Sequence, residues 1–157
     1  MQKKYSIKAL RAAAESISDY LSRVSDKAPA FRERLSEYSL DPDVSEGLRG
    51  YAGEVSVVVF SAEWCSDCYR NVSVLGLLSD ETGLEVLVFG QLMRDPKNPE
   101  ELWRIPPSPP EVREFNVVKI PLIVILDKEG RKLGAVVENP PEGETLERVL
   151  LDILEQS

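Results

Sequence analysis

Histidine is absent from all 157 residues of the sequence, and cysteine occurs only twice, at Cys65 and Cys68. Without His the chain lacks the usual general base and the usual switch near neutral pH, which excludes hydrolase triads built on His. A tetrahedral zinc site takes four ligands, usually Cys or His. Two cysteines alone do not supply four ligands, so we expect no metal and no cofactor.

Basic residues and long apolar runs are also scarce. The 19 Lys and Arg are outnumbered by 27 Asp and Glu, for a net charge of -8, so we expect no nucleic-acid partner. No apolar stretch reaches the roughly 18 residues that a membrane helix needs, and no signal-peptide pattern opens the chain. We therefore expect a cytoplasmic protein without membrane contact.

Few Asn and Gln, together with 29% charged residues, favour a thermophile source.

The length predicts a single hydrophobic core with at most an appendage. Apolar residues at steps of three and four between Tyr5 and Val24 predict one amphipathic helix, and shorter helices are expected around 31–38 and from Asp41 onward. We assign residues 1–53 to this N-terminal extension. Its apolar stripe is expected to pack on the protein's own sheet, with a dimerising coil as the alternative.

From residue 54 the pattern alternates between strands and helices. The β-branched run Val55–Phe60 predicts a strand buried on both faces. The other predicted elements are a helix from Cys65 to Gly83, a strand over 84–89, a loop over 91–110, a short helix over 111–115, a strand over 120–126, an antiparallel edge strand over 132–137 and a helix after Glu142. Trp103 is expected to anchor the loop, with a substrate contact as the alternative. This order predicts an α/β fold with a mixed sheet of about four strands flanked by helices.

The two cysteines stand two residues apart, between a predicted strand and a predicted helix. Thiol-disulfide exchange needs an attacking thiolate and a nearby second thiol that releases the mixed disulfide. At a helix start the first sulfur lies beside unpaired N–H groups and the positive end of the dipole, which lowers its pKa. The second sulfur lies one turn further into the helix and is more protected from solvent. This arrangement predicts Cys65 as the attacking thiol and Cys68 as the resolving thiol.

Residues 57–68 read Val-Val-Val-Phe-Ser-Ala-Glu-Trp-Cys-Ser-Asp-Cys and resemble the active-site strand and loop of the thioredoxin superfamily. The sequence Val118-Lys119-Ile120-Pro121 is similar to the cis-proline loop of that superfamily. More narrowly, the Trp-Cys-x-Asp-Cys pattern and the helical extension resemble a group of bacterial and archaeal thioredoxin-family proteins. The resemblance implies a thioredoxin-like fold over residues 54–157 and a cis Ile120-Pro121 bond against the cysteines. It also implies that the Ile120 backbone pairs with an extended substrate strand.

The sequence departs from thioredoxin at two places. Ser66-Asp67 replaces Gly-Pro between the cysteines, and Val59 stands where thioredoxin buries an Asp thought to take the resolving thiol's proton. The remaining nearby carboxylates are Asp67, our candidate catalytic residue, and Glu63, with solvated loop charges as the alternative for both. Trp64 is our candidate platform for substrates, and the alternative is a rim aromatic that covers the helix start.

These residues favour a thiol-disulfide oxidoreductase that reduces protein disulfides and is recycled by a thioredoxin-reductase-type electron donor. The alternative is a redox-idle binding module of the same fold, in which a Cys65-Cys68 disulfide is structural or regulatory. The helix N-terminus lowers the Cys65 pKa and the carboxylates raise it, so we expect a value of ~7 to 8. A potential near that of thioredoxin, roughly -270 mV, follows from this balance. The pattern makes no prediction of oligomeric state.

Overall fold

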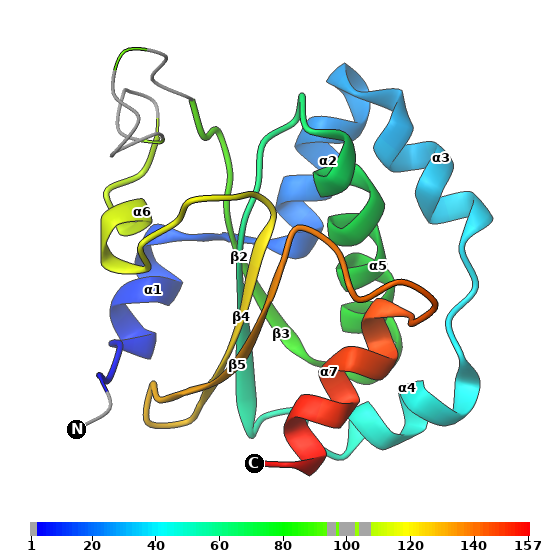
Figure 1. The fold of residues 1–157 in the computed structure, drawn as a ribbon. Helices are drawn as coiled ribbons and strands as arrows, with labels where there is room; N and C mark the ends of the chain where they lie inside the picture. The colour runs from blue at the N-terminus through cyan, green and yellow to red at the C-terminus, as the bar shows by residue number, and fades with distance from the viewer. Residues whose placement is uncertain (1–2, 94–96, 98–102, 104–107) are drawn as a thin grey trace.

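The computed structural model describes residues 3–93, 97, 103 and 108–157. Most of the N-terminal third of this part of the chain is helical, and most of the strands follow it (Figure 1). In chain order the helices and strands are α1 (Ile7–Ala13), β1 (Glu15–Ser16), α2 (Ile17–Lys27), α3 (Pro29–Glu37), α4 (Pro42–Arg49), β2 (Val55–Phe60), α5 (Ser66–Thr82), β3 (Glu85–Phe89), α6 (Glu111–Glu114), β4 (Leu122–Asp127), β5 (Lys132–Val137) and α7 (Leu146–Glu155). The loop predicted over 91–110 lies largely outside the described residues.

The strands form one mixed sheet in the order β1-β3-β2-β4-β5. β2 pairs in parallel with β3 and antiparallel with β4, and β5 adds antiparallel to β4 at the edge. Every residue of β2 is buried, because this strand lies between two neighbours and under helices. The predicted α/β fold, with a mixed sheet flanked by helices, is confirmed.

The N-terminal segment contains a break that its apolar spacing does not predict. Instead of one helix over residues 5–24, the chain forms α1 and α2 with β1 between them, so the expectation of one helix is wrong. Ser16 begins α2 by accepting a hydrogen bond from the Asp19 N–H, and Glu15 pairs with Val88 of β3. The two residues of β1 pair with the open edge of β3, which gives the sheet a fifth strand.

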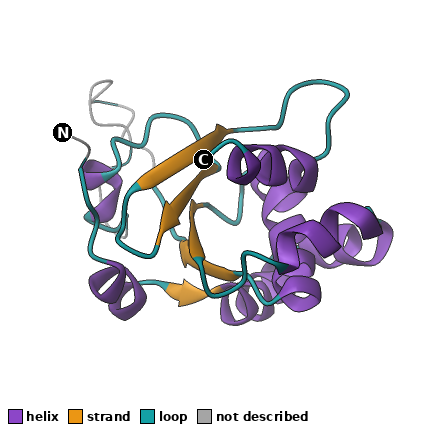
Figure 2. Cartoon of the chain, turned by 90° about the horizontal axis from the view of Figure 1, so that it is seen from below, coloured by secondary structure: helices purple, strands orange, loops and turns teal. Residues whose placement is uncertain are grey.

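Helices cover both faces of the sheet. Figures 1 and 2 show α1 and α6 on one face and α2, α3, α4, α5 and α7 on the other. α5 contacts α2, α3, α4 and α7, and so forms the centre of the larger helical layer. Because α5 follows β2 directly, its N-terminus lies at the carboxyl end of a buried central strand.

The N-terminal helices share the hydrophobic core with the rest of the chain. Tyr20 and Val24 of α2 and Phe31 of α3 are fully buried. The Phe31 ring packs edge-on against Tyr69 of α5, with ring centroids 6.0 Å apart. α2 also contacts β3 and α5, which confirms that the apolar stripe packs on the protein's own core. The boundary between an extension at 1–53 and a domain at 54–157 stays a prediction.

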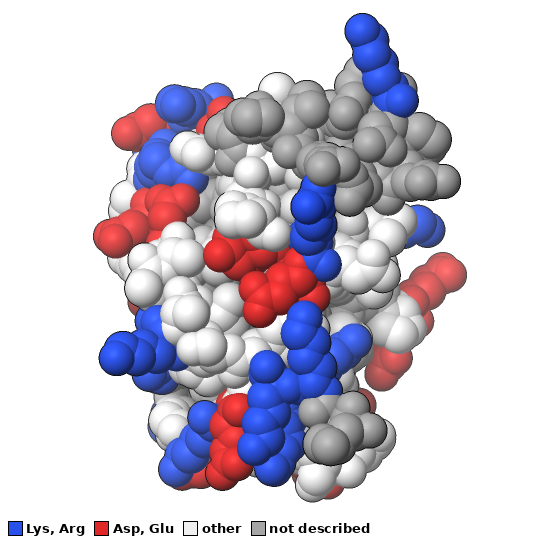
Figure 3. Space-filling model, turned by 90° about the vertical axis from the view of Figure 1, so that its left-hand side faces the viewer, with Lys and Arg blue, Asp and Glu red and all other residues white. Residues whose placement is uncertain are grey.

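The surface carries charges of both signs. On the face that carries α1 and α6, Lys and Arg side chains are interspersed with Asp and Glu (Figure 3). Lys4, which precedes α1, and Arg131 both pair with the Glu129 carboxylate, at 3.7 and 3.5 Å. In the part of the chain that the structure describes, no helix combines the length and apolar character needed to cross a bilayer.

Candidate active site

Cys65 lies at the junction between β2 and α5, where it is the N-cap residue of the helix. Its sulfur accepts a hydrogen bond from the Cys68 N–H at 3.3 Å, in the way that a Ser or Asp oxygen caps other helices. The residue is partly exposed. The local sequence therefore places a nucleophile at the positive end of a helix of 17 residues.

The environment favours the thiolate form of Cys65 and lowers its pKa to about 7. The largest cause is a hydrogen bond with the Cys68 side chain, and the backbone N–H groups of Cys68 and Asp67 act in the same direction. Partial burial and the negative charge of Asp67 oppose this shift and raise the pKa. The result agrees with the expected balance between a helix N-terminus and nearby carboxylates.

Cys68 differs from Cys65 in both exposure and acidity. It lies in the first turn of α5 with no exposed surface, and both cysteines are free thiols. Burial, followed by the hydrogen bond with Cys65, raises the pKa of Cys68 far above its ordinary value. The pair therefore combines one accessible thiolate at neutral pH with one protected thiol.

The loop before β4 lies against the exposed cysteine. The Ile120 carbonyl accepts a weak hydrogen bond from the Cys65 thiol, with the sulfur and oxygen 3.8 Å apart. The Ile120-Pro121 peptide bond is cis, and both residues are buried. Residues distant in sequence thus meet at one end of the sheet, because β4 pairs directly with β2.

The family model described as thioredoxin matches residues 14–150 of the chain. The chain belongs to the thioredoxin family. A solved protein of unknown function from Pseudomonas aeruginosa is similar, with 19% identity, 97% of this chain and 98% of that chain covered, and a TM-score of 0.69. An HIV epitope-scaffold has 19% identity, coverage of 98% and 99%, and a TM-score of 0.67. A comparison with curated proteins finds no match. At these identities the likeness shows the fold alone, here over nearly the whole chain.

Two tryptophans line the site of this thioredoxin-family chain. Trp64 is 57% exposed, and its indole N–H donates to the Leu92 carbonyl at 3.3 Å. It stacks on Trp103, with ring centroids 6.0 Å apart. Trp103 is buried and donates to the Val118 carbonyl at 2.9 Å, so its predicted role as an anchor is confirmed. Trp64 therefore presents an exposed aromatic ring beside Cys65, and its contacts with Trp103 and the Leu92 carbonyl hold this ring in place.

The predicted carboxylates take different positions. Asp67 lies in the first turn of α5, 3.7 Å from the Arg70 guanidinium, and acts on Cys65 through its charge. One oxygen of Glu63 is buried and has no hydrogen-bond partner in the described structure, and its charge acts on Arg23 of α2. Val59, at the position where thioredoxin buries an Asp, is fully buried in β2. The buried side chain at that position is therefore apolar.

The structure adds polar residues that the sequence pattern did not single out. Asn71 is buried in α5, and its amide donates to the Asp67 and Glu138 carbonyls, each at 2.9 Å. A polar residue on an apolar helix face is the sequence signal that could have indicated these hydrogen bonds.

Ser61, just after β2, and Tyr20 of α2 are fully buried, and their hydroxyl oxygens are hydrogen-bonded at 2.8 Å. No local pattern links these two residues, because they come from distant parts of the chain.

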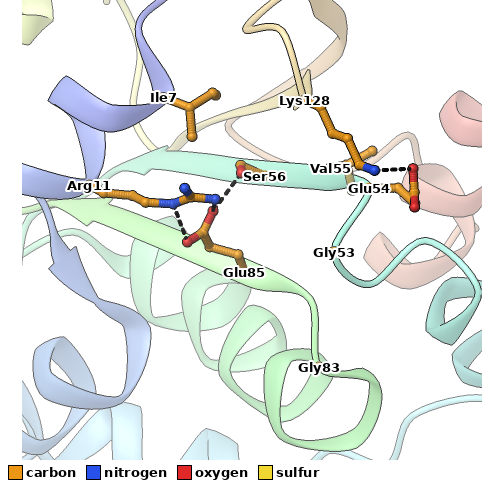
Figure 4. Close-up of a pocket in the computed structure, with 9 residues that line it drawn as sticks. All are labelled: Ile7, Arg11, Gly53, Glu54, Val55, Ser56, Gly83, Glu85 and Lys128. Carbon is orange, nitrogen blue, oxygen red and sulfur yellow. Dashed lines mark hydrogen bonds and ion pairs between the residues drawn. The ribbon is translucent and has the colours of Figure 1, made fainter.

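A crevice of about 440 Å³ lies at the start of β2, the opposite end of the strand from the cysteines. Figure 4 shows that its charged side chains point toward one another. Arg11 pairs with Glu85 at 2.8 Å, and Lys128 pairs with Glu54 at 3.2 Å. Glu85 also accepts from the Ser56 hydroxyl. Each of these charged side chains has a partner within the crevice. Among the described residues, no group of three or more His, Cys, Asp or Glu is placed to hold a metal ion.

Proposed function

We propose that this thioredoxin-family chain is a thiol-disulfide oxidoreductase that reduces protein disulfides with Cys65 and Cys68. The observation that supports it is the inequality of the pair. Cys65 is accessible and has a pKa of about 7, whereas Cys68 is buried and its pKa is raised. An accessible thiolate beside a protected thiol is the arrangement that disulfide exchange requires.

The proposed reaction has two steps. The Cys65 thiolate attacks one sulfur of a substrate disulfide, which forms a mixed disulfide and releases the other substrate sulfur as a thiolate. Cys68 then attacks the Cys65 sulfur, which closes the Cys65-Cys68 disulfide and releases the second substrate thiol. The substrate gains two electrons in all. A thioredoxin-reductase-type donor returns them to the pair, and a reducing cytosol suits this direction.

Substrate binding is assigned to the residues around Cys65. Trp64 presents its exposed ring, and Val118, which is 54% exposed, adds apolar surface on the adjoining loop. An extended substrate segment would lie along the backbone at Ile120 beside Pro121, since backbone groups recognise a strand without regard to its side chains. Asp67 is assigned the role of setting the Cys65 pKa through its charge. The substrates would therefore be disulfide-containing proteins of varied sequence.

Insulin reduction by the wild-type protein and two cysteine variants tests the proposal. We expect turnover in the wild type and none in Cys65→Ser. We expect Cys68→Ser to accumulate mixed disulfides that gel electrophoresis without reductant detects, because that variant keeps the attacking thiol but cannot resolve the product. Equal trapping by both variants would overturn the assignment of roles. A wild-type protein that binds partners but reduces no disulfide would favour the redox-idle binding module.

A further inference from the structure

The buried surroundings of Cys68 contain two hydroxyl groups that the reaction above does not use. Ser61 lies directly after β2, and Tyr20 belongs to α2 in the N-terminal segment. The side chains of Tyr20, Ser61 and Cys68 have no exposed surface. The two hydroxyl oxygens are 2.8 Å apart, and the Ser61 side chain acts on the buried Cys68 thiol by lowering its pKa.

A buried resolving thiol needs hydrogen-bond donors when it carries charge. Burial is the largest influence on Cys68 and raises its pKa, whereas the hydrogen bonds from the Ala62 backbone and from Ser61 lower it. A negative sulfur without donors in a dry interior is strongly disfavoured. Among the described residues, three titratable groups outside this cluster act on it. The charge of Cys65 raises the pKa of Cys68. The charge of Glu15 raises the pKa of Tyr20, and that of Arg23 lowers it. None of them supplies a carboxylate in contact with the Cys68 sulfur.

Tyr20 is suited to remain a donor throughout the reaction. Burial raises its pKa far above the usual value for a phenol, so the hydroxyl keeps its proton at neutral pH. Arg23 lies over the ring, with its guanidinium carbon 5.3 Å from the centroid. Either oxygen of the Tyr20–Ser61 hydrogen bond can donate. When Tyr20 donates to Ser61, the Ser61 proton is free to point at the Cys68 sulfur.

We infer that Tyr20 and Ser61 form a hydrogen-bond chain that stabilises negative charge on Cys68 while it resolves the mixed disulfide. This inference rests on the proposed function. In that step the Cys68 sulfur forms a bond to the Cys65 sulfur, and the bond between Cys65 and the substrate sulfur breaks. The bonding pair leaves on the substrate sulfur, which takes up from solvent a proton equivalent to the one that Cys68 releases. Tyr20 acts through Ser61 and is a positioning residue, contributed by the N-terminal helices.

Reaction of the full-length reduced protein with 5,5′-dithiobis(2-nitrobenzoate) separates the two steps. The first release of coloured thiolate reports attack by Cys65, and the second reports closure by Cys68. We expect Tyr20→Phe to leave the rate of the first step within about twofold of wild type. The rate of the second step should fall about tenfold at every pH tested, because a hydrogen bond that supports a charge is lost. Ser61→Ala should slow the second step at least as much, and Ser61→Thr, which keeps the hydroxyl, should restore it.

Tyr38→Phe is the matched control, because Tyr38 donates a hydrogen bond of 2.6 Å to Glu147 away from the cysteines. We expect this variant to keep both steps. A second step in Tyr20→Phe that equals wild type, or that is slowed equally in Tyr38→Phe, would overturn the inference. If insulin is not reduced while the two-step chemistry and its dependence on Tyr20 persist, reduction of protein disulfides fails as the function, but the exchange step on which the inference rests remains.

Discussion

The backbone N–H of Cys68 donates a hydrogen bond to the Cys65 sulfur over a distance of 3.3 Å. Through this contact the resolving residue helps to activate the attacking one, because the donor lies inside the helix that the acceptor caps. The same turn buries the Cys68 side chain, so one short helical segment gives the two sulfurs opposite properties.

The reactivity of Cys65 should depend on pH near neutrality. Its pKa is lowered to about 7, so the rate of alkylation by iodoacetamide should rise as pH increases through that value and level off above it. Cys68 should stay unmodified over the same range, because its pKa is raised and its sulfur is buried. Mass spectrometry after timed alkylation checks both statements. A midpoint at or above about pH 8.5, the value of an ordinary thiol, would contradict them.

Removing the charge of Asp67 should make Cys65 more acidic. The Asp67 carboxylate raises the Cys65 pKa, so Asp67→Asn should shift the alkylation midpoint to lower pH and make the disulfide more oxidising. The control is Asp80→Asn, an exposed carboxylate near the other end of α5, which should leave the midpoint unchanged. An unchanged midpoint in Asp67→Asn would remove this residue from the site.

The exposed ring of Trp64 should matter for protein substrates only. We expect Trp64→Ala to raise the KM for insulin about tenfold, because a large aromatic contact is lost. The rate with a small aromatic disulfide should change little, since that reaction needs only the Cys65 sulfur. Steady-state kinetics with both substrates on one protein preparation make the comparison. Equal loss with both substrates would assign Trp64 a structural role at the helix start.

Local sequence pattern predicts much of this structure. The apolar run Val55–Phe60 by itself identifies β2. The cysteine spacing and Gly83 mark the start and the end of α5 in the same way. The unequal cysteine pair follows from the same local information, because helix capping and burial in a first turn act within a few residues.

Contacts between distant segments are what the sequence does not reveal. β1 forms because Glu15 meets Val88 at an open sheet edge, while the apolar spacing around it remains that of a helix. The Tyr20–Ser61 hydrogen bond likewise depends on how α2 packs against the sheet. Neither contact leaves a pattern in the neighbouring residues, so only the assembled fold brings them together.

The N-terminal helices should contribute measurably to stability. Phe31 is fully buried beneath the contact between α3 and α5, so Phe31→Ala should lower the free energy of unfolding by about 3–5 kcal/mol. Val137, which is 51% exposed, provides the control: Val137→Ala should change it by less than about 0.5 kcal/mol. Urea denaturation followed by circular dichroism measures both. A Phe31→Ala protein as stable as wild type would mean that the packing of α3 on α5 does not contribute to stability.

The reduction potential of the Cys65-Cys68 pair tests the central claim most directly. Strong oxidants of this chemistry have an attacking cysteine with a pKa near ~3.5, because a stabilised thiolate favours the reduced form. Cys65, with a pKa of about 7, lacks that stabilisation. Titration in glutathione redox buffers, with thiol alkylation and mass spectrometry, should therefore give an intramolecular disulfide with a potential near ~-270 mV. A potential above about -200 mV, or no disulfide between these residues, would contradict the assignment as a reductase.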